Sequence, residues 1–385
     1  MIAASSRAAD SLWRAVFDRA AWPGSIVFFG ALPVLVLALL FASTIEDGSV
    51  AIDFRPFHRA ADAIVDGEDP YPEDDARLTA SGGPYVYPPP AAIATIPLTA
   101  FSLDVAELMV MTSLVLVALA IPLVLGVRDW RCYGLVLLWP PVISAIQTGN
   151  VTLWFALAAA LAWRLRDRRS AGVAVGLTLA IKFVLWPLVV WLIATRRALD
   201  GLLACAVGAL LILVSWAAIG FTGFTDYPRL LRRLEDAVGQ DAYTINNLML
   251  DLGVSATIAW IAWASVGLAL LAAVVAAGRR GDDRSAFILG IGAALALSPL
   301  VWLHYFALLL VAVAVARPAL GLAWLIPLAM VVAPGSGNPT LLETLTVLCA
   351  AALTLALALR SSTKRAGAAG ADPLSSRSSD RKSVV

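Results

Sequence analysis

The sequence predicts an all-α, polytopic integral membrane protein with about twelve transmembrane helices. Hydrophobic residues make up 60% of the 385 residues, and only 14% are charged. The mean hydropathy is +0.84, whereas about a quarter of the residues of an ordinary soluble domain are charged. The composition therefore excludes a soluble domain, and the hydrophobic runs suffice for roughly ten or more spans of about 20 residues each.

Basic residues cluster at the ends of the predicted spans and indicate the orientation. Short loops that are rich in lysine and arginine stay on the cytoplasmic side of a membrane. One assignment places most of the 28 basic residues there. It makes both termini cytoplasmic, together with the connections around Arg131, Arg164–Arg169, Arg196 and Arg280. We therefore expect a multi-pass protein of the plasma membrane.

This orientation requires the chain to turn back between successive cytoplasmic clusters. The turns are expected near residues 147–150, 182–183 and 298–299. Each helical leg then has only about 12–16 residues, roughly 18–24 Å, and is shorter than the ~30 Å hydrocarbon core. Irregular backbone at such depth is tolerated only inside protein or beside a water-filled cavity. The three turns therefore predict a cavity that opens to the outside.

The chain divides into three predicted parts. Residues 1–24 form a cytoplasmic or interfacial segment, and residues 25–360 form one transmembrane domain. Residues 361–385 are rich in Ser, Arg and Ala without periodicity, which predicts a disordered cytoplasmic tail. The apolar piece from Pro88 to Phe101 does not fit as a crossing, because it would invert everything downstream. It is therefore interpreted as re-entrant or interfacial, and whether it crosses stays open.

The densest polar stretch follows the first predicted span. Residues 45–75 carry ten acidic side chains and His58, one of only two histidines. Asp53 follows the first span closely, so it must lie near the outer membrane face. We expect the chemistry of the protein in this loop, in the extracytoplasmic space. Asp62 and Asp69 remain alternatives to Asp53, and most of the other acids are interpreted as solvated charges.

Lys182 and His304 are ionisable residues within apolar segments. A lysine in hydrocarbon costs about 2.5–3.5 kcal/mol on insertion scales, so it normally faces a cavity or a partner. Lys182 either snorkels to the interface or meets an anionic group, such as a phosphate, at the outer face. His304 comes after Pro299 and beside Tyr305. It is either a hydrogen-bonded core residue or a titratable donor at the cavity that Lys182 faces.

The sequence indicates neither a metal nor a cofactor. The three cysteines lie in apolar runs, and no Cys/His spacing resembles a zinc site. The net charge of +1 comes with scattered basic residues, which gives no indication of nucleic acid. Asn150-Val151-Thr152 matches a glycosylation sequon, but its place in a sunken turn argues against modification.

Several short motifs follow one another along the chain. They are Asp53, Gly67-x-Asp69-Pro70-Tyr71, Tyr87-Pro88-Pro89, Gln147 to Asn150, Lys182 and Ser298-Pro299-x-x-Trp302-x-His304-Tyr305. Taken in this order, they resemble glycosyltransferase family 87, whose members are membrane enzymes of the GT-C class that use polyprenyl-phosphate sugars. The resemblance covers roughly residues 25 to 360. The chain has Lys182-Phe183 where the family usually has Lys-Pro, and Gln147-Thr148-Gly149-Asn150 where it has Gly-Gln-x-Asn.

The resemblance implies a GT-C-like fold and a transferase. Such an enzyme would move mannose or another sugar from a polyprenyl-phosphate donor to a glycolipid or glycan outside the membrane. It would be similar to actinobacterial α-mannosyltransferases that depend on polyprenyl-phosphate mannose. Its partners would be the donor, the acceptor and membrane lipids. Without the resemblance, a transporter, a lipid or polyprenyl-linked substrate flippase or a membrane scaffold would remain as alternatives.

The resemblance also implies roles for the candidate residues. GT-C enzymes invert the anomeric carbon, so one base must take the proton of the acceptor hydroxyl. Asp53 is the candidate base. Lys182 and His304 are candidates for stabilising the phosphate leaving group, since its charge grows in the transition state. The remaining substrate-binding candidates are Asn150, Gln147, Tyr305, His58 and Tyr71.

Overall fold

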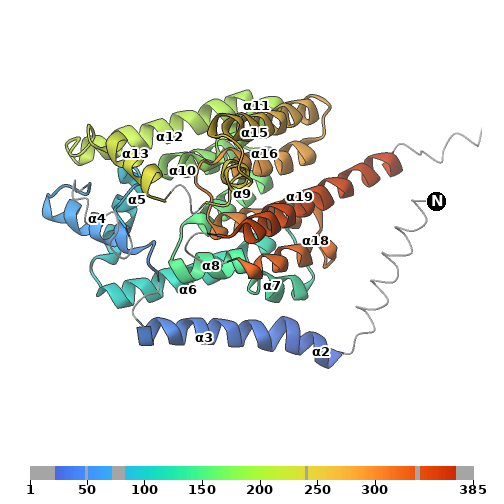
Figure 1. The fold of residues 1–385 in the computed structure, drawn as a ribbon, viewed down its shortest axis with the longest axis horizontal. Helices are drawn as coiled ribbons and strands as arrows, with labels where there is room; N and C mark the ends of the chain where they lie inside the picture. Colours follow the sequence, from blue (N-terminus) through green and yellow to red (C-terminus); the bar gives the residue numbers. More distant parts are fainter. Residues whose placement is uncertain (1–21, 48–50, 72–82, 239–241, 334–338, 370–385) are drawn as a thin grey trace, which may run out of the picture.

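The computed structural model describes residues 22–47, 51–71, 83–238, 242–333 and 339–369, and every regular element in these ranges is helical (Figure 1). This confirms the all-α prediction. Most of the predicted N-terminal segment lies outside the described residues. Helix α19, Leu341–Ala369, extends into the predicted tail, and residues 370–385 lie outside the described ranges.

Five helices in the described ranges are long and apolar enough to cross a membrane. The first span lies within α2 (Trp22–Ile26), a π-helical turn (Val27–Ala31) and α3 (Leu32–Asp47). The others are single helices in which the few charged residues lie near the ends of the spans. A chain with several such helices is a membrane protein. The spans are Gly24–Ser43, Leu103–Val124 (α6), Ala198–Ala218 (α12), Ala256–Arg279 (α15) and Leu341–Arg360 within α19.

The remaining apolar helices are shorter, so the count of twelve crossings stays a prediction. They are α5 with its 3-10 turn (Pro89–Leu98), α9 (Thr152–Arg164), α10 (Ser170–Ile181), η4–α11 (Phe183–Ala194), η6–α17 (Leu303–Ala316) and α18–η7 (Leu322–Val332). The other helices are α4 (Arg55–Asp66), α7 (Trp130–Val136), α8 (Pro140–Thr148), α13 (Tyr227–Val238), α14 (Ile245–Asp251) and α16 (Asp283–Leu297).

Local sequence explains where these short helices begin and end. Asp129 and Asp282 cap the first turns of α7 and α16, because their carboxylates accept backbone N–H groups. Gly149, at φ 69°, ends α8 in the left-handed conformation that glycine adopts without steric cost. Lys182 is extended, with φ −155° and ψ 136°, and separates α10 from η4. The predicted turns at residues 147–150 and 182–183 are therefore real helix ends.

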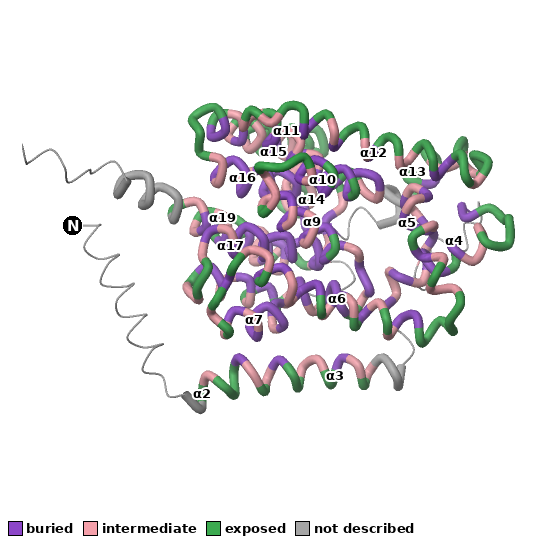
Figure 2. Tube along the Cα trace, turned by 180° about the vertical axis from the view of Figure 1, so that it is seen from behind, coloured by how far each residue is buried: buried purple, intermediate pink, exposed green. Residues whose placement is uncertain are grey.

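Buried residues gather in the interior of the helix assembly, and exposed residues lie along its outer helices (Figure 2). Trp139, Trp191 and Trp324 are fully buried. On α3, by contrast, Val34 and Leu39 are 66% and 61% exposed. Extensive exposed apolar surface is unfavourable in water and is expected where helices face lipid.

The short helices connect two opposite ends of the molecule. Helix α9 begins beside Asn150 and ends at Arg164, and its 13 residues rise about 20 Å. Helix α10 then returns from Ser170 to Ile181, directly before Lys182. Figure 1 shows α4 and α13 at one end, whereas the described end of α19 extends to the other. The polar turns thus meet at one end of the helices, and the arginine-rich connections meet at the other.

Candidate active site

The main chain fixes the position of Asp53. The N–H groups of Ala51 and Asp53 donate to the carbonyl groups of Gln147 and Thr148, at 2.6 and 2.8 Å. These carbonyls belong to the last turn of α8, where no further helical N–H can reach them. Ala51 is fully buried at φ 59°, and a Cβ on Gly149 would approach the Ala51 Cβ to 3.1 Å. The loop after the first span therefore fits closely against the end of α8.

Asn150 orients the Asp53 carboxylate. Its Nδ2 donates to Asp53 Oδ2 at 2.7 Å. Its Oδ1 accepts two hydrogen bonds from Thr152, from the backbone N–H at 2.9 Å and from the hydroxyl at 2.6 Å. Since Thr152 occupies the oxygen of the amide, the amide nitrogen must face Asp53. The Asp53 side chain is 31% exposed, and its Oδ1 takes no hydrogen bond from any described residue.

The segment after α16 brings His304 to the same carboxylate. His304 Nδ1 lies 4.0 Å from Asp53 Oδ2, and the imidazole is 4% exposed. Neither ring nitrogen has a hydrogen-bond partner among the described residues. The ring stacks on Tyr305, with centroids 4.9 Å apart and planes at 29°. His304 therefore contacts the side of Asp53 that Asn150 already holds.

Lys182 lies beside Tyr305 and Tyr87. Its ammonium group donates a hydrogen bond to the Tyr305 hydroxyl. It also lies 5.0 Å from the centroid of the Tyr87 ring and 4.9 Å from that of Tyr305, within the range of cation–π attraction. The half-buried ammonium is thus held by aromatic neighbours and does not extend freely to the interface.

An aromatic cluster supports the Tyr87 segment. The Tyr71 hydroxyl donates to the Tyr87 carbonyl at 2.9 Å, and the Tyr227 hydroxyl donates to the Val86 carbonyl at 3.1 Å. The Tyr71 ring stacks on Trp216, with centroids 5.2 Å apart. Burial, followed by the charges of Tyr227 and Asp69, raises the pKa of Tyr71 well above its usual value. Tyr71 therefore stays a neutral donor and acts on the site through Tyr87.

His58 and Gln147 lie next to this centre without joining it. His58 Nδ1 pairs with Asp62 Oδ2 at 3.0 Å, its ring packs against Phe54, and its Nε2 has no hydrogen-bond partner among the described residues. The Gln147 side chain is exposed, and its contribution is the backbone carbonyl that receives Ala51. Of the predicted residues, Asp53, Asn150, His304, Tyr305 and Lys182 are thus the ones that contact one another.

Two contributions were not predicted from the sequence. Thr152 orients Asn150. The Asn-x-Thr spacing was the only feature of the sequence that pointed to this role. Arg55 Nε donates to Glu107 Oε1 at 2.7 Å, and Glu107 is 3% exposed within the apolar helix α6. This ion pair ties the first turn of α4, two residues after Asp53, to α6, one of the helices long and apolar enough to cross a membrane. An acidic residue inside a hydrophobic span was the signal for it.

The arrangement combines a partly exposed carboxylate with a fixed ammonium group and a buried imidazole. A carboxylate with one free oxygen can accept a proton, and an ammonium with a neighbouring hydroxyl can stabilise developing negative charge. In the described ranges, no three His, Cys, Asp or Glu side chains are grouped so that they could hold a metal ion. The residues present therefore suit proton transfer with electrostatic stabilisation of an anion.

Comparison with known proteins identifies one family. The sequence profile of glycosyltransferase family 87 matches residues 85–301, more than half of the chain. The match includes Tyr87, Asn150 and Lys182, whereas Asp53 precedes it and His304 follows it. Neither the curated proteins nor the solved structures gave a match. The matched length shows that this chain belongs to glycosyltransferase family 87.

Proposed function

We propose that this membrane glycosyltransferase moves a sugar, with mannose as the first candidate, from a polyprenyl-phosphate donor to a glycolipid or glycan acceptor. In this proposal the transfer occurs on the extracytoplasmic side and inverts the anomeric carbon. The main support is the geometry of Asp53. Its Oδ2 is held by Asn150, while its Oδ1 is left without a described partner, as a base for an incoming hydroxyl requires.

The proposed reaction assigns a role to each polar group. The acceptor hydroxyl oxygen attacks the anomeric carbon and forms the new C–O bond, while its proton passes to Asp53. The bond between the anomeric carbon and the donor phosphate breaks, and its electron pair leaves with the phosphate. Lys182 and the Tyr305 hydroxyl stabilise the charge on that phosphate. His304 packs against Asp53 Oδ2 with both ring nitrogens buried, so it is assigned no contact with the donor or the acceptor.

The choice of a lipid-linked donor rests on where the site lies. Lys182 ends an apolar helix, and Asp53 follows the first membrane-spanning segment. A donor with its isoprenoid chain in lipid could therefore present its phosphate at the level of these residues. The resemblance of the motifs to polyprenyl-phosphate-mannose enzymes favours mannose. The acceptor class follows from the same resemblance.

The test of the base is Asp53→Asn and Asp53→Ala, assayed in membranes for transfer from polyprenyl-phosphate mannose. Both changes are expected to lower the transfer rate by about 10²–10⁴-fold, as loss of general-base catalysis does. Asp66→Asn is the matched control, since Asp66 is an exposed acid at the end of the same α4. Its rate should stay within about twofold of the wild type.

Two outcomes would contradict parts of this proposal. Full activity of Asp53→Asn at unchanged protein level would remove Asp53 as the base. Transfer from a nucleotide sugar, but not from polyprenyl-phosphate mannose, would replace the donor while leaving the base assignment in place.

The glycolipids of a deletion strain should show an accumulated species, which is the acceptor.

A further inference from the structure

A second polar centre lies at the end of the helices opposite Asp53. The connection between α9 and α10 lines a cavity of about 470 Å³, with Arg164, Leu165, Asp167 and Arg168 in its wall. Since α9 runs from the Asn150 turn to Arg164, this cavity is separated from the candidate active site by the length of a 13-residue helix. It takes no part in the proposed transfer.

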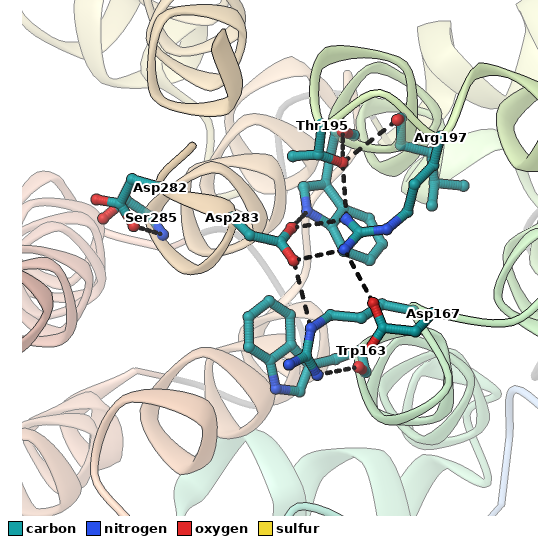
Figure 3. Close-up of polar contacts among 10 residues, drawn as sticks. Trp163, Asp167, Thr195, Arg197, Asp282, Asp283 and Ser285 are labelled. Carbon is teal, nitrogen blue, oxygen red and sulfur yellow. Dashed lines mark hydrogen bonds and ion pairs between the residues drawn. The ribbon is translucent and has the colours of Figure 1, made fainter. Parts of the chain in front are cut away.

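Acidic groups next to the cavity are already paired. Asp283 accepts from Arg197 at 2.9 Å and from Trp191 Nε1 at 2.7 Å, and pairs with Arg166 at 3.3 Å (Figure 3). Asp167 Oδ1 lies 3.4 Å from Arg197. Burial lowers the pKa of Arg197, but the hydrogen bonds and charges of Asp283 and Asp167 outweigh it and leave that pKa raised. Arg197 therefore stays charged and compensates the acid that lines the cavity.

Two arginines of the cavity wall remain uncompensated. The guanidinium groups of Arg164 and Arg168 are exposed and have neither an ion pair nor a hydrogen bond with any described residue. Arg168 also precedes the N-terminus of α10, whose peptide dipoles add positive potential. The cavity thus has two free guanidinium groups in its wall, and its one carboxylate, Asp167, lies 3.4 Å from Arg197, so the balance of charge favours an anion.

The surroundings indicate an anion that is attached to an apolar body. Arg169, next in the chain, pairs with Asp200 at 2.9 Å. On either side of Asp200, Leu199 and Leu202 are 63% and 62% exposed. Exposed leucines beside a basic cavity suit a molecule that has a charged head and an acyl tail. Basic pockets at the ends of transmembrane helices bind anionic lipid headgroups in this way.

We propose that the cavity binds a phosphate group, contributed by an anionic phospholipid of the adjacent leaflet. Arg164 and Arg168 would bind the phosphate oxygens through paired N–H groups, a geometry for which guanidinium is suited. The acyl chains would lie along the exposed leucines at the start of α12. Soluble phosphate shares this chemistry, and the experiment below separates the two sources.

The experiment measures phosphatidylglycerol binding to the purified full chain in neutral detergent by native mass spectrometry. The variant is Arg164→Gln/Arg168→Gln, and the matched control is Arg279→Gln/Arg280→Gln, two exposed arginines at the same end of the molecule. The variant should lose roughly 30-fold in affinity, and the control about twofold or less. Phosphatidylcholine should bind the wild type, the variant and the control equally weakly.

Three results would overturn the proposal or its lipid source. Unchanged phosphatidylglycerol binding in the Arg164/Arg168 variant would remove the site. An equal loss in the control pair would show general electrostatic attraction instead of a site. Inorganic phosphate that binds with the same arginine dependence, and displaces phosphatidylglycerol completely, would retain the site but overturn the lipid source. Matching thermal unfolding of the variants confirms that they are folded.

Discussion

At the scale of single residues, Thr152 influences the orientation of Asp53, although it does not contact the carboxylate. Its two hydrogen bonds occupy Asn150 Oδ1 and so determine which amide atom faces Asp53. Without the hydroxyl, Asn150 Oδ1 keeps only the backbone N–H of Thr152, so the amide is held less firmly against the carboxylate. The orientation of the candidate base therefore depends on a residue that does not touch it.

This gives a prediction for Thr152. Thr152→Val keeps the shape but removes the hydroxyl donor, and should lower kcat by about 10–100-fold, because small losses of orientation are costly in catalysis. KM for the donor should change little. Thr152→Ser keeps the donor and should remain within about threefold of the wild type.

The kinetic constants distinguish orientation from a general loss of fold. Equal kcat for the valine and serine variants would show that the hydroxyl does not orient Asn150. A parallel fall in the amount of folded protein would indicate a structural role instead, so each rate is divided by the folded protein measured in the same membranes.

The sequence identified most of the central site residues, but not how they are connected. Asp53, Asn150, Lys182, His304 and Tyr305 were predicted, and they meet. Tyr71 was predicted to bind substrate, whereas its hydroxyl bonds to the main chain of Tyr87. Side-chain hydrogen bonds of this kind depend on angles and on distances of a few ångströms, which spacing along the chain does not contain.

At the scale of helices, α10 and α12 pack through glycines. A Cβ added to Gly172 would lie 2.3 Å from the Asp200 carbonyl oxygen, and one on Gly176 would lie 2.7 Å from the Ala204 carbonyl oxygen. The spacing Gly172-x-x-x-Gly176 allows close approach of helices in membranes, where van der Waals packing drives association. This contact fixes the position of α10, and α10 ends directly before Lys182.

Gly172→Ala should therefore destabilise the protein. A methyl group pressed against backbone cannot be relieved by rotating a side chain, and overpacking typically costs about 1–3 kcal/mol. Thermal unfolding in detergent should show a lower Tm. Gly321→Ala is the control, since nothing lies within 4 Å of its added Cβ and its backbone is extended. A Tm equal to that of the wild type for Gly172→Ala would contradict the close packing.

The helix ends were easier to predict than the helix lengths. Charge clusters and polar turns located the breaks near Gly149 and Lys182, because such residues are costly inside apolar helices. The short legs between the breaks do not by themselves reveal how many of them cross a membrane. Composition alone cannot separate a crossing helix from one that is buried in protein.

At the scale of the whole molecule, the candidate active-site residues and the arginine-rich connections lie at opposite ends. Reporter fusions test how these ends are oriented. Fusions after Asp167 and Asp282 should report a cytoplasmic position, because both adjoin arginine clusters. Fusions after Asp75 and Glu235 should report the extracytoplasmic side. A reporter active only in the external compartment, paired with one active only inside, gives opposite readings at each position.

The fusion after Asp75 is the decisive one. A cytoplasmic reading there would place the acidic loop, and Asp53 with it, on the wrong side for a lipid-linked donor outside. Agreement at all four positions would fix the side on which each of these four connections lies. It would still leave the number of crossings to be measured by labelling within the short helices.

The attachment of Ala51 and Asp53 to α8 through main-chain groups has a further consequence. Every residue type has a carbonyl group, and every type except proline has an amide N–H group, so this pairing does not itself require particular side chains beside Asp53. The family match begins at residue 85. In distant relatives, the equivalent acid should be sought by its main-chain pairing with the α8 turn, and not by the letters around it.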